Sequence, residues 1–328
     1  MDFSRGMKEF KSNFTSLFLL SISHLVNSSI TIHPTPPIWQ PTSNALLPNK
    51  LTLRGAYGSE DVPVLSLLMN VVEGLADLAH LPSQHRIRGF HVANLPEFTD
   101  TDISIQPTAP AVDLEVSIAV DGLYAILYDM TRNKSFKNAD FDLCWNYVKV
   151  ARVLINKRGK SADSTGISAS PTDVSPGQTA SSLDSTTGVA SRAENAGLGW
   201  HFEYFESAAK IAPQIFFITV MATLKHIAQW PETDVVEPFL SGPPGFDTRF
   251  QFFPRDTPRS EPPFLLYGSL IDVLRQLPAF ALEKKKFAEL MMIMSFGEDV
   301  IGEAVVDIRS LGIRNASMGG ILDNVARV

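Results

Sequence analysis

Apolar residues recur at three- and four-residue steps in four segments of the chain, which is the spacing of an amphipathic helix. These segments are residues 64–78, 116–130, 211–227 and 266–277. Pro63 and Pro213 stand near the start of the first and third segments, and Pro82 and Pro231 follow their ends. Because proline suits a first helical turn and cannot continue a last one, the pattern predicts four bounded helices.

Strand-like segments surround each pair of predicted helices. A short alternating run opens each group, at 51–55 and at 200–206. Two strand-like runs close each group: 139–146 with 148–156 in the first, and 286–296 with 300–308 in the second. Gly297, Glu298 and Asp299 predict a hairpin turn in the second group.

The segment 290–294 is apolar at every position. This pattern is typical of a strand that is covered on both faces. In the first group, Phe141, Leu143 and Trp145 instead alternate with more polar residues, which indicates one wetter face.

The shared order of elements is strand, helix, helix, strand, strand, over residues 51–157 and again over 200–309. It predicts an α+β protein of two tandem pseudo-repeats, in which antiparallel sheets pack against helices. Two arrangements are open at this point. The sheets either join into one layer with the helices chiefly on one side, or form two sheets that face one another.

Three other segments carry no helical or strand period. Residues 29–50 contain five prolines and predict an extended lead-in. Residues 158–199 predict a flexible, disordered linker, because the segment is rich in Ser and Thr and has little apolar surface to offset its ordering entropy. Residues 310–328 form a C-terminal tail.

Residues 1–28 predict a signal peptide. A basic start precedes the apolar run 14–26, which is shorter than the roughly 20 residues that a membrane-spanning helix needs. Cleavage after Ser28 would place the protein in the secretory pathway, where Asn133 and Asn315 are glycosylation sequons. The alternative is a cytoplasmic protein whose apolar leader packs on the body or binds a partner.

The second predicted hairpin carries a resemblance to known proteins. An amphipathic helix, a strand, a glycine-containing turn and a strand beginning near Ile301-Gly302-Glu303-Ala304 resemble uncharacterised fungal secreted proteins. The resemblance covers 260–309 and, more loosely, 122–157. It implies an α+β fold, and it supplies no activity, cofactor or catalytic residue.

Composition and motifs exclude several functional classes. The net charge of -7 disfavours nucleic-acid binding. The single cysteine, Cys144, excludes an intramolecular disulfide framework and a four-cysteine zinc site, and its apolar surroundings indicate a small buried side chain. The dinucleotide, P-loop, zinc-protease, nucleophile-elbow and EF-hand motifs are absent from the sequence. No cofactor and no metal are therefore predicted.

The remaining polar candidates are small groups of residues. Asp140 and Asp142 share one face of a predicted strand, so they could perform paired acid/base work if that face lined a cleft. His201 and Glu203 share a face of another strand. Three carboxylates at 97, 100 and 102 and a basic patch at 85–91 are interpreted as solvated loops.

Two apolar groups could serve either a core or a ligand. The phenylalanines at 216, 217, 250, 252 and 253 and the methionines at 291, 292 and 294 are interpreted first as core packing. If either group were exposed as one patch, a partner surface or an apolar ligand site would follow.

Three functional hypotheses result. The first is a non-catalytic secreted protein that binds a protein partner or an apolar small molecule. The second is a hydrolase-like enzyme of unfamiliar type that uses Asp140, Asp142 and His201 in a cleft between the repeats. The third is an intracellular scaffold whose Ser/Thr-rich linker is phosphorylated.

Overall fold

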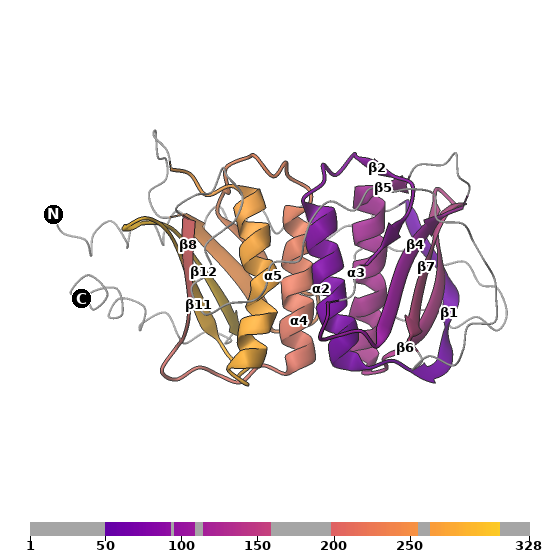
Figure 1. Ribbon diagram of the computed structural model, residues 1–328, viewed down its shortest axis with the longest axis horizontal. Coiled ribbons are helices and arrows are strands. Elements are labelled where there is room, and N and C mark those ends of the chain that lie inside the picture. The colour runs from indigo at the N-terminus through magenta and orange to yellow at the C-terminus, as the bar shows by residue number, and fades with distance from the viewer. Residues whose placement is uncertain (1–49, 93–94, 109–113, 159–197, 255–262, 309–328) are drawn as a thin grey trace.

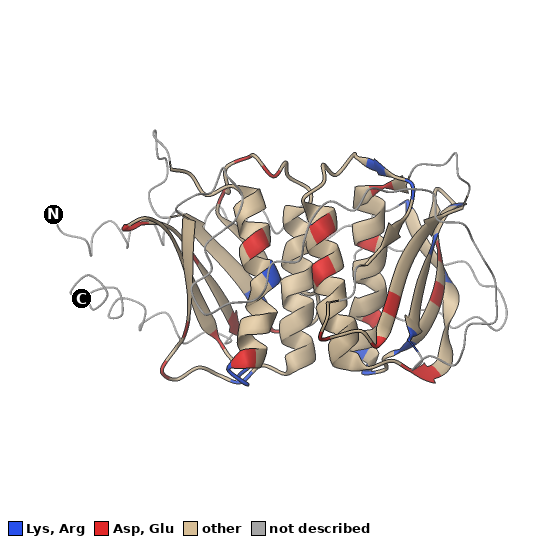
Figure 2. Cartoon of the chain, viewed as in Figure 1, with Lys and Arg blue, Asp and Glu red and all other residues tan. Residues whose placement is uncertain are grey.

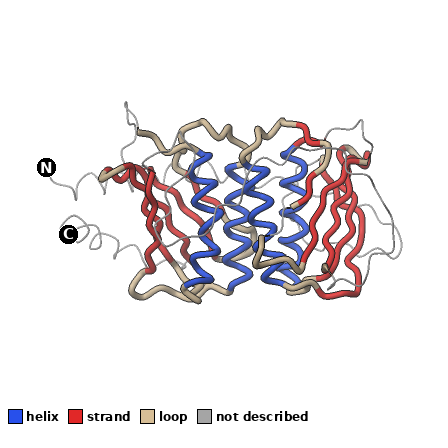
Figure 3. The backbone as a smooth tube through the Cα atoms, viewed as in Figure 1, coloured by secondary structure: helices blue, strands red, loops and turns tan. Residues whose placement is uncertain are grey.

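The described part of the chain contains two five-stranded sheets and four helices. The helices lie between the two sheets, as the ribbon in Figure 1 and the tube in Figure 3 show. The computed structural model describes residues 50–92, 95–108, 114–158, 198–254 and 263–308. The two sheets are separate and antiparallel, and each is built from one half of the chain. The predicted α+β class is thus confirmed, and of the two open arrangements the structure has two sheets, with the helices between them.

The first unit contains one five-stranded sheet and two long helices. Its elements are β1 (Leu51–Asp61), α2 (Val64–Ala79), β2 (Arg86–Ile87), β3 (Phe90–His91), β4 (Thr101–Pro107), β5 (Leu114–Glu115), α3 (Val116–Asn133), β6 (Lys137–Trp145) and β7 (Val148–Lys157). The strand order in the sheet is β1-β6-β7-β4-β3, and β2 pairs with β5 alone. We call residues 50–158 the first unit.

The second unit, residues 198–308, has the same kind of architecture. Its elements are β8 (Leu198–Tyr204), α4 (Pro213–Ile227), β9 (Phe239–Ser241), β10 (Thr248–Pro254), α5 (Tyr267–Glu283), β11 (Leu290–Phe296) and β12 (Asp299–Ile308). The order β8-β11-β12-β10-β9 places each strand as its counterpart lies in the first sheet. The topologies correspond; a repeat in the sequence itself stays a prediction.

Each unit has more strands than the three of the expected order: β2, β3, β4 and β5 are additional in the first, and β9 and β10 in the second. The strands β4 and β10 lie between the two helices of their units, in stretches that we expect from the sequence to be connections. Their buried residues alternate, as Thr101, Ile103 and Ile105 show in β4. Prolines end both strands, at Pro107 and Pro254, and this proline-rich context hides the alternation.

The helix boundaries agree with the proline signals. Pro63 directly precedes α2, and Pro213 is the first residue of α4, so Ile211 lies just before the helix. The hairpin turn at Gly297 is also confirmed, with φ of 61° at this glycine between β11 and β12. A left-handed conformation costs glycine little, because glycine has no Cβ.

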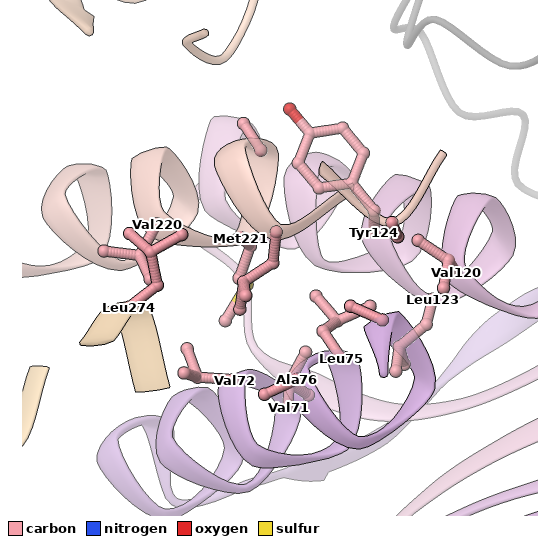
Figure 4. Close-up of a cluster of buried hydrophobic side chains, with 14 of the residues drawn as sticks. Val71, Val72, Leu75, Ala76, Val120, Leu123, Tyr124, Val220, Met221 and Leu274 are labelled. Carbon is pink, nitrogen blue, oxygen red and sulfur yellow. The ribbon is translucent and has the colours of Figure 1, made fainter. Parts of the chain in front are cut away.

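The helices of the two units pack directly on one another (Figure 4). Ten residues from all four helices meet there, and each is 3% exposed or less: Val71, Val72, Leu75, Ala76, Val120, Leu123, Tyr124, Val220, Met221 and Leu274. Complete burial of a side chain of this size contributes roughly 1.5–3 kcal/mol. The apolar layer therefore joins the units into one body.

Several expectations lie outside the described residues. These are the signal peptide, the lead-in, nearly all of the linker, the C-terminal tail and Asn315. Within the described part of the chain, no helix is long and apolar enough to cross a membrane.

Candidate functional site

The residues of the hydrolase hypothesis lie in different sheets. Asp140 and Asp142 are on β6, and His201 is on β8. The two sheets form opposite ends of the molecule, with the helix layers between them (Figure 1). The structure therefore does not bring His201 to the aspartates, and these three residues share no cleft between the units.

Both aspartates are engaged in ion pairs on the outer face of the first sheet. Arg152 donates from Nε to Asp140 Oδ1 at 2.7 Å and from Nη2 to Oδ2. This hydrogen bonding lowers the pKa of Asp140. Lys149 Nζ lies 2.6 Å from Asp142 Oδ1. A lowered pKa makes Asp140 a poor proton donor near neutral pH, and both aspartates are held in cross-strand ion pairs.

The other polar candidates are surface or structural residues. Asp102 lies on β4, with His91 Nε2 at 3.3 Å and Arg158 Nη2 at 3.7 Å from its Oδ1. Among the described residues, no group of three or more His, Cys, Asp or Glu side chains is placed so that it could hold a metal ion. Cys144 is buried, as expected, and burial raises the pKa of its thiol. Asn133 is exposed at the end of α3.

The structure instead gathers ionisable groups between the two units, which sequence reasoning missed. Acidic and basic positions meet on the facing sides of α2 and α5 in Figure 2. We call this group the inter-unit ionic cluster: Glu73, Asp77 and His80 from the first unit, and Glu232, Asp272 and Arg275 from the second.

His80 bridges the units with both of its ring nitrogens. Nδ1 lies 3.0 Å from Glu232 Oε2, and Nε2 lies 3.0 Å from Asp272 Oδ1. Because each ring nitrogen has a carboxylate of the second unit as its partner, the arrangement is suited to clamping the two units together.

Arg275 of α5 makes the neighbouring contact with α2. Its Nη2 donates to Asp77, and its Nη1 lies 3.5 Å from Glu73 Oε1. Burial raises the pKa of Glu73, and the guanidinium only partly offsets this effect. The cluster therefore holds four carboxylates against Arg275 and His80.

A second ionic contact joins α3 to α4. Lys225 Nζ lies 2.9 Å from Asp121 Oδ1 and 5.0 Å from the centre of the Tyr124 ring. Both side chains of the pair are 14% exposed. Burial raises the pKa of Asp121 in spite of the nearby ammonium. These contacts position the units against one another.

The outer face of the second sheet has a different composition. Register places the side chains of Leu240, Phe253, Met291, Ile293 and Val305 on the side away from the helices. We call these five residues the apolar outer face. Phe216, Phe217, Phe250, Phe252, Met292 and Met294 are fully buried, as the core interpretation expects. Met291 and Val305 lie on the outer side of the sheet but are buried as well, at 8% and 4% exposure, whereas Phe253 is partly exposed there.

Carboxylates stand among these apolar residues. Glu303 lies between Phe253 and Ile293 across the strands, and Glu203 pairs in register with Met291. Neither carboxylate forms an ion pair with another residue of the described ranges. Arg249 and Asp307 on the same face pair with each other at 2.8 Å. Gln251 and His201 also lie on this side, so the face mixes apolar and polar side chains and has an excess of carboxylates.

The Lys225–Asp121 pair predicts strong coupling between the units. Replacing Asp121→Asn or Lys225→Met alone leaves a buried charge without its partner, and we expect each to lower the free energy of unfolding by about 3–5 kcal/mol. The double variant should lose clearly less than the sum of the two single losses. Urea unfolding of the four proteins measures this coupling; additive losses would contradict a direct interaction.

Glu73 predicts a dependence of stability on pH. Because the folded-state pKa of Glu73 is raised above 4.5, the folded chain binds its proton more tightly than the unfolded chain does. The resulting stabilisation is present below pH 4.5 and is lost as the pH rises through the folded-state pKa. In Glu73→Gln this loss should disappear, so the variant gains stability relative to the natural chain over that window.

Urea unfolding at half-unit steps from pH 4 upward measures this difference. Glu203→Gln, at an exposed position, is the matched control and should follow the natural chain. Parallel curves for Glu73→Gln and the natural chain would show that burial of Glu73 has no effect on its titration.

No family model, no curated protein and no solved structure matches this chain. The resemblance to fungal secreted proteins stays a prediction.

Proposed function

We propose that this protein is a non-catalytic binding protein, and that its interaction surface is the apolar outer face of the second sheet. The observation that carries the proposal is the difference between the two outer faces. Both sheets have corresponding strand orders and helices on one side only among the described residues, yet their outer side chains differ in kind.

The outer face of the first sheet is built for contact with water. Asp140 and Asp142 are neutralised by Arg152 and Lys149, and the flanking positions on β4 are polar. Pairs of this kind keep an exposed sheet soluble and contribute little net stability. On the second sheet, Met291, Ile293 and Val305 take the middle of the face instead; Ile293 is partly exposed there, whereas Met291 and Val305 are buried.

The charge of the second face favours one kind of ligand. Glu203 and Glu303 lie beside the apolar residues, so a segment that offers apolar side chains flanked by Lys or Arg would complement the surface. Small apolar molecules are usually held in concave sites, whereas the outermost layer of a sheet suits a peptide. We therefore propose a basic, amphipathic peptide segment of a partner protein as the ligand.

The two other hypotheses have less support. Asp140, Asp142 and His201 lie in separate sheets, so the hydrolase-like site lacks the geometry that acid/base work needs. The Ser/Thr-rich linker of the scaffold hypothesis lies outside the described residues.

The binding proposal is tested with a fluorescein-labelled model peptide of Leu and Lys at helical spacing, and with a Leu/Glu peptide of the same length. We expect the Leu/Lys peptide to bind at least about tenfold more tightly by fluorescence anisotropy, which corresponds to roughly 1.4 kcal/mol. Ile293→Lys should weaken this binding by a similar factor, because the new ammonium disrupts the apolar surface and repels the peptide.

Leu154→Lys is the matched control for this test. Leu154 is a partly exposed aliphatic residue on the outer face of the first sheet, as Ile293 is on the second. Equal weakening by both variants, or no difference between the two peptides, would contradict the proposed surface.

Secretion is a further part of the proposal, supported by the predicted signal peptide and by the exposed sequon at Asn133. In cells that make the protein, we expect a form in the medium that begins near Ser29 and carries added mass at Asn133. Intact mass and N-terminal sequencing of medium and lysate measure this. A full-length chain confined to the lysate would contradict secretion.

A further inference from the structure

Four strands stand at the edges of the two sheets, and three of them are poorly suited to pairing with another chain. A sheet edge leaves backbone N–H and C=O groups unpaired, and proteins limit this risk with short strands, prolines and irregularities. The edge strand β3 has two residues, and β9 has three residues with Pro238 directly before it. The long edge strand β1 has an irregular register between Tyr57 and Asp61.

The fourth edge strand, β8, lacks these protections. Its seven residues pair with β11 in one unbroken register, from Leu198 opposite Phe296 to Tyr204 opposite Leu290. It contains no proline, and the side chains on its inner side are apolar or aromatic. Among the described residues, no strand pairs with its other edge. The strand β8 therefore presents an open row of backbone hydrogen-bonding groups.

The open edge is also held in a fixed position. The rings of Phe202 and Tyr204 lie 4.9 and 5.6 Å from the ring of Phe280 on α5, and Trp200 is only 4% exposed. A strand that is already fixed loses little conformational freedom when it pairs, so less of the association free energy is lost to ordering.

We propose that a second copy of this chain pairs with β8, so that two second sheets join antiparallel at their β8 strands into one continuous sheet. This dimer goes beyond the proposed function and does not depend on the peptide site. Two observations identify the second copy as the partner: the charge pattern of β8, and the space that the helices leave.

The charge pattern of β8 is complementary to itself. His201 and Glu203 are both exposed on the outer side of the strand. Backbone groups point to the open edge at every second residue, so an antiparallel pair of identical strands has a residue at its centre. A pair centred on Phe202 places His201 opposite Glu203 of the second copy, and the two-fold symmetry repeats this contact.

Neighbouring registers lack this match. A pair centred on His201 places two imidazoles opposite one another, and a pair centred on Glu203 does the same with two carboxylates. Like charges directly opposite one another destabilise a sheet, whereas a basic and an acidic residue stabilise it. A histidine ring can donate a hydrogen bond to a carboxylate in its charged and in its neutral form. The register centred on Phe202 is therefore favoured.

The helices leave room for the joined sheet. Five strands at about 4.8 Å spacing span roughly 19 Å from first to last, and two helices of about 10 Å diameter cover the same width. In the second unit, α5 packs over β8, and α4 packs over β9 and β10. The helices of two copies can therefore lie side by side on the inner side of the joined sheet.

Sedimentation velocity of the full chain, from micromolar to submillimolar concentration, tests the dimer without any ligand. We expect a reversible dimer in the natural chain. His201→Glu and Glu203→Lys each place like charges opposite one another at two symmetry-related contacts. Each variant should therefore weaken dimerisation at least about tenfold. A natural chain that stays monomeric over the whole range, or a dimer that both variants leave intact, would overturn the proposal.

Mixing the two variants tests the register itself. In a mixed dimer the introduced carboxylate at position 201 faces the introduced ammonium at position 203, and the natural Glu203 of one chain faces the natural His201 of the other. We expect the mixture to dimerise with an affinity close to that of the natural chain, which also shows that both variants are folded. The double variant His201→Glu with Glu203→Lys should dimerise by itself. If the mixture and the double variant both stay monomeric, pairing centred on Phe202 is wrong.

Arg54→Glu is the matched control for the change in charge. Arg54 is an exposed residue on β1, the edge strand of the first sheet that corresponds to β8. The variant should dimerise as the natural chain does. Equal weakening by Arg54→Glu and His201→Glu would mean that net charge, and not pairing at β8, governs association.

Amide hydrogen exchange with mass spectrometry identifies what covers the edge. In the natural chain, the amides of β8 that do not pair with β11 should exchange more slowly as protein concentration rises, while exchange in β1 stays constant. Slow exchange in β8 of a monomer at every concentration would mean that another segment of the same chain covers the edge. Fast exchange at every concentration would mean that nothing in the chain pairs there, which leaves the edge to a different protein. Either result overturns the proposed dimer, as does a dimer whose formation leaves exchange in β8 unchanged.

Discussion

The structure depends on the burial of four helices between two sheets. A helix in this position must be apolar toward its own sheet and also toward the helices of the other unit. The middle of α4 shows the result, because residues 216–224 are all buried. Any charged side chain that enters such a layer needs a partner there, since an unpaired buried charge costs several kcal/mol. Lys225 and Arg275 meet this requirement through Asp121, Asp77 and Glu73, all on helices of the other unit.

The ionic contacts favour one relative position of the two units, which the apolar contacts between the helices do not. Apolar side chains such as Leu75 and Met221 are stabilised wherever they leave water, so burial alone tolerates sliding of one helix pair along the other. His80 has two carboxylates at 3.0 Å, one on each side of its ring, and a shift of one helical turn would break both contacts. We infer that the inter-unit ionic cluster fixes the relative position of the units, while apolar burial supplies most of the stability.

Helices and hairpins could be predicted from the sequence, whereas contacts between residues far apart in the chain could not be predicted. Period and proline signals predict the four helices and both C-terminal hairpins of the units, because these features depend on neighbours in the chain. The strands β4 and β10 were missed, since prolines next to Thr101–Pro107 and Thr248–Pro254 mask a short alternation. The ionic cluster was missed for another reason: His80 and Asp272 are 192 residues apart, and neither stands in a local sequence pattern that indicates its partner. The same limit made Asp140 and His201 look like possible neighbours, although they lie in separate sheets.

The outer side chains of a sheet are the positions that this fold constrains least. Backbone hydrogen bonds hold the strands together. The inner residues, such as Met292 and Ala304, are buried on the side that packs against the helices. A polar residue at the partly exposed Ile293 would leave the register and the inner packing unchanged, as the charged outer face of the first sheet demonstrates with Asp140 and Arg152. Apolar residues on the second outer face are therefore not required by the architecture. Met291 and Val305 are nonetheless only 8% and 4% exposed, so these two side chains are removed from water although the helices lie on the other side of the sheet.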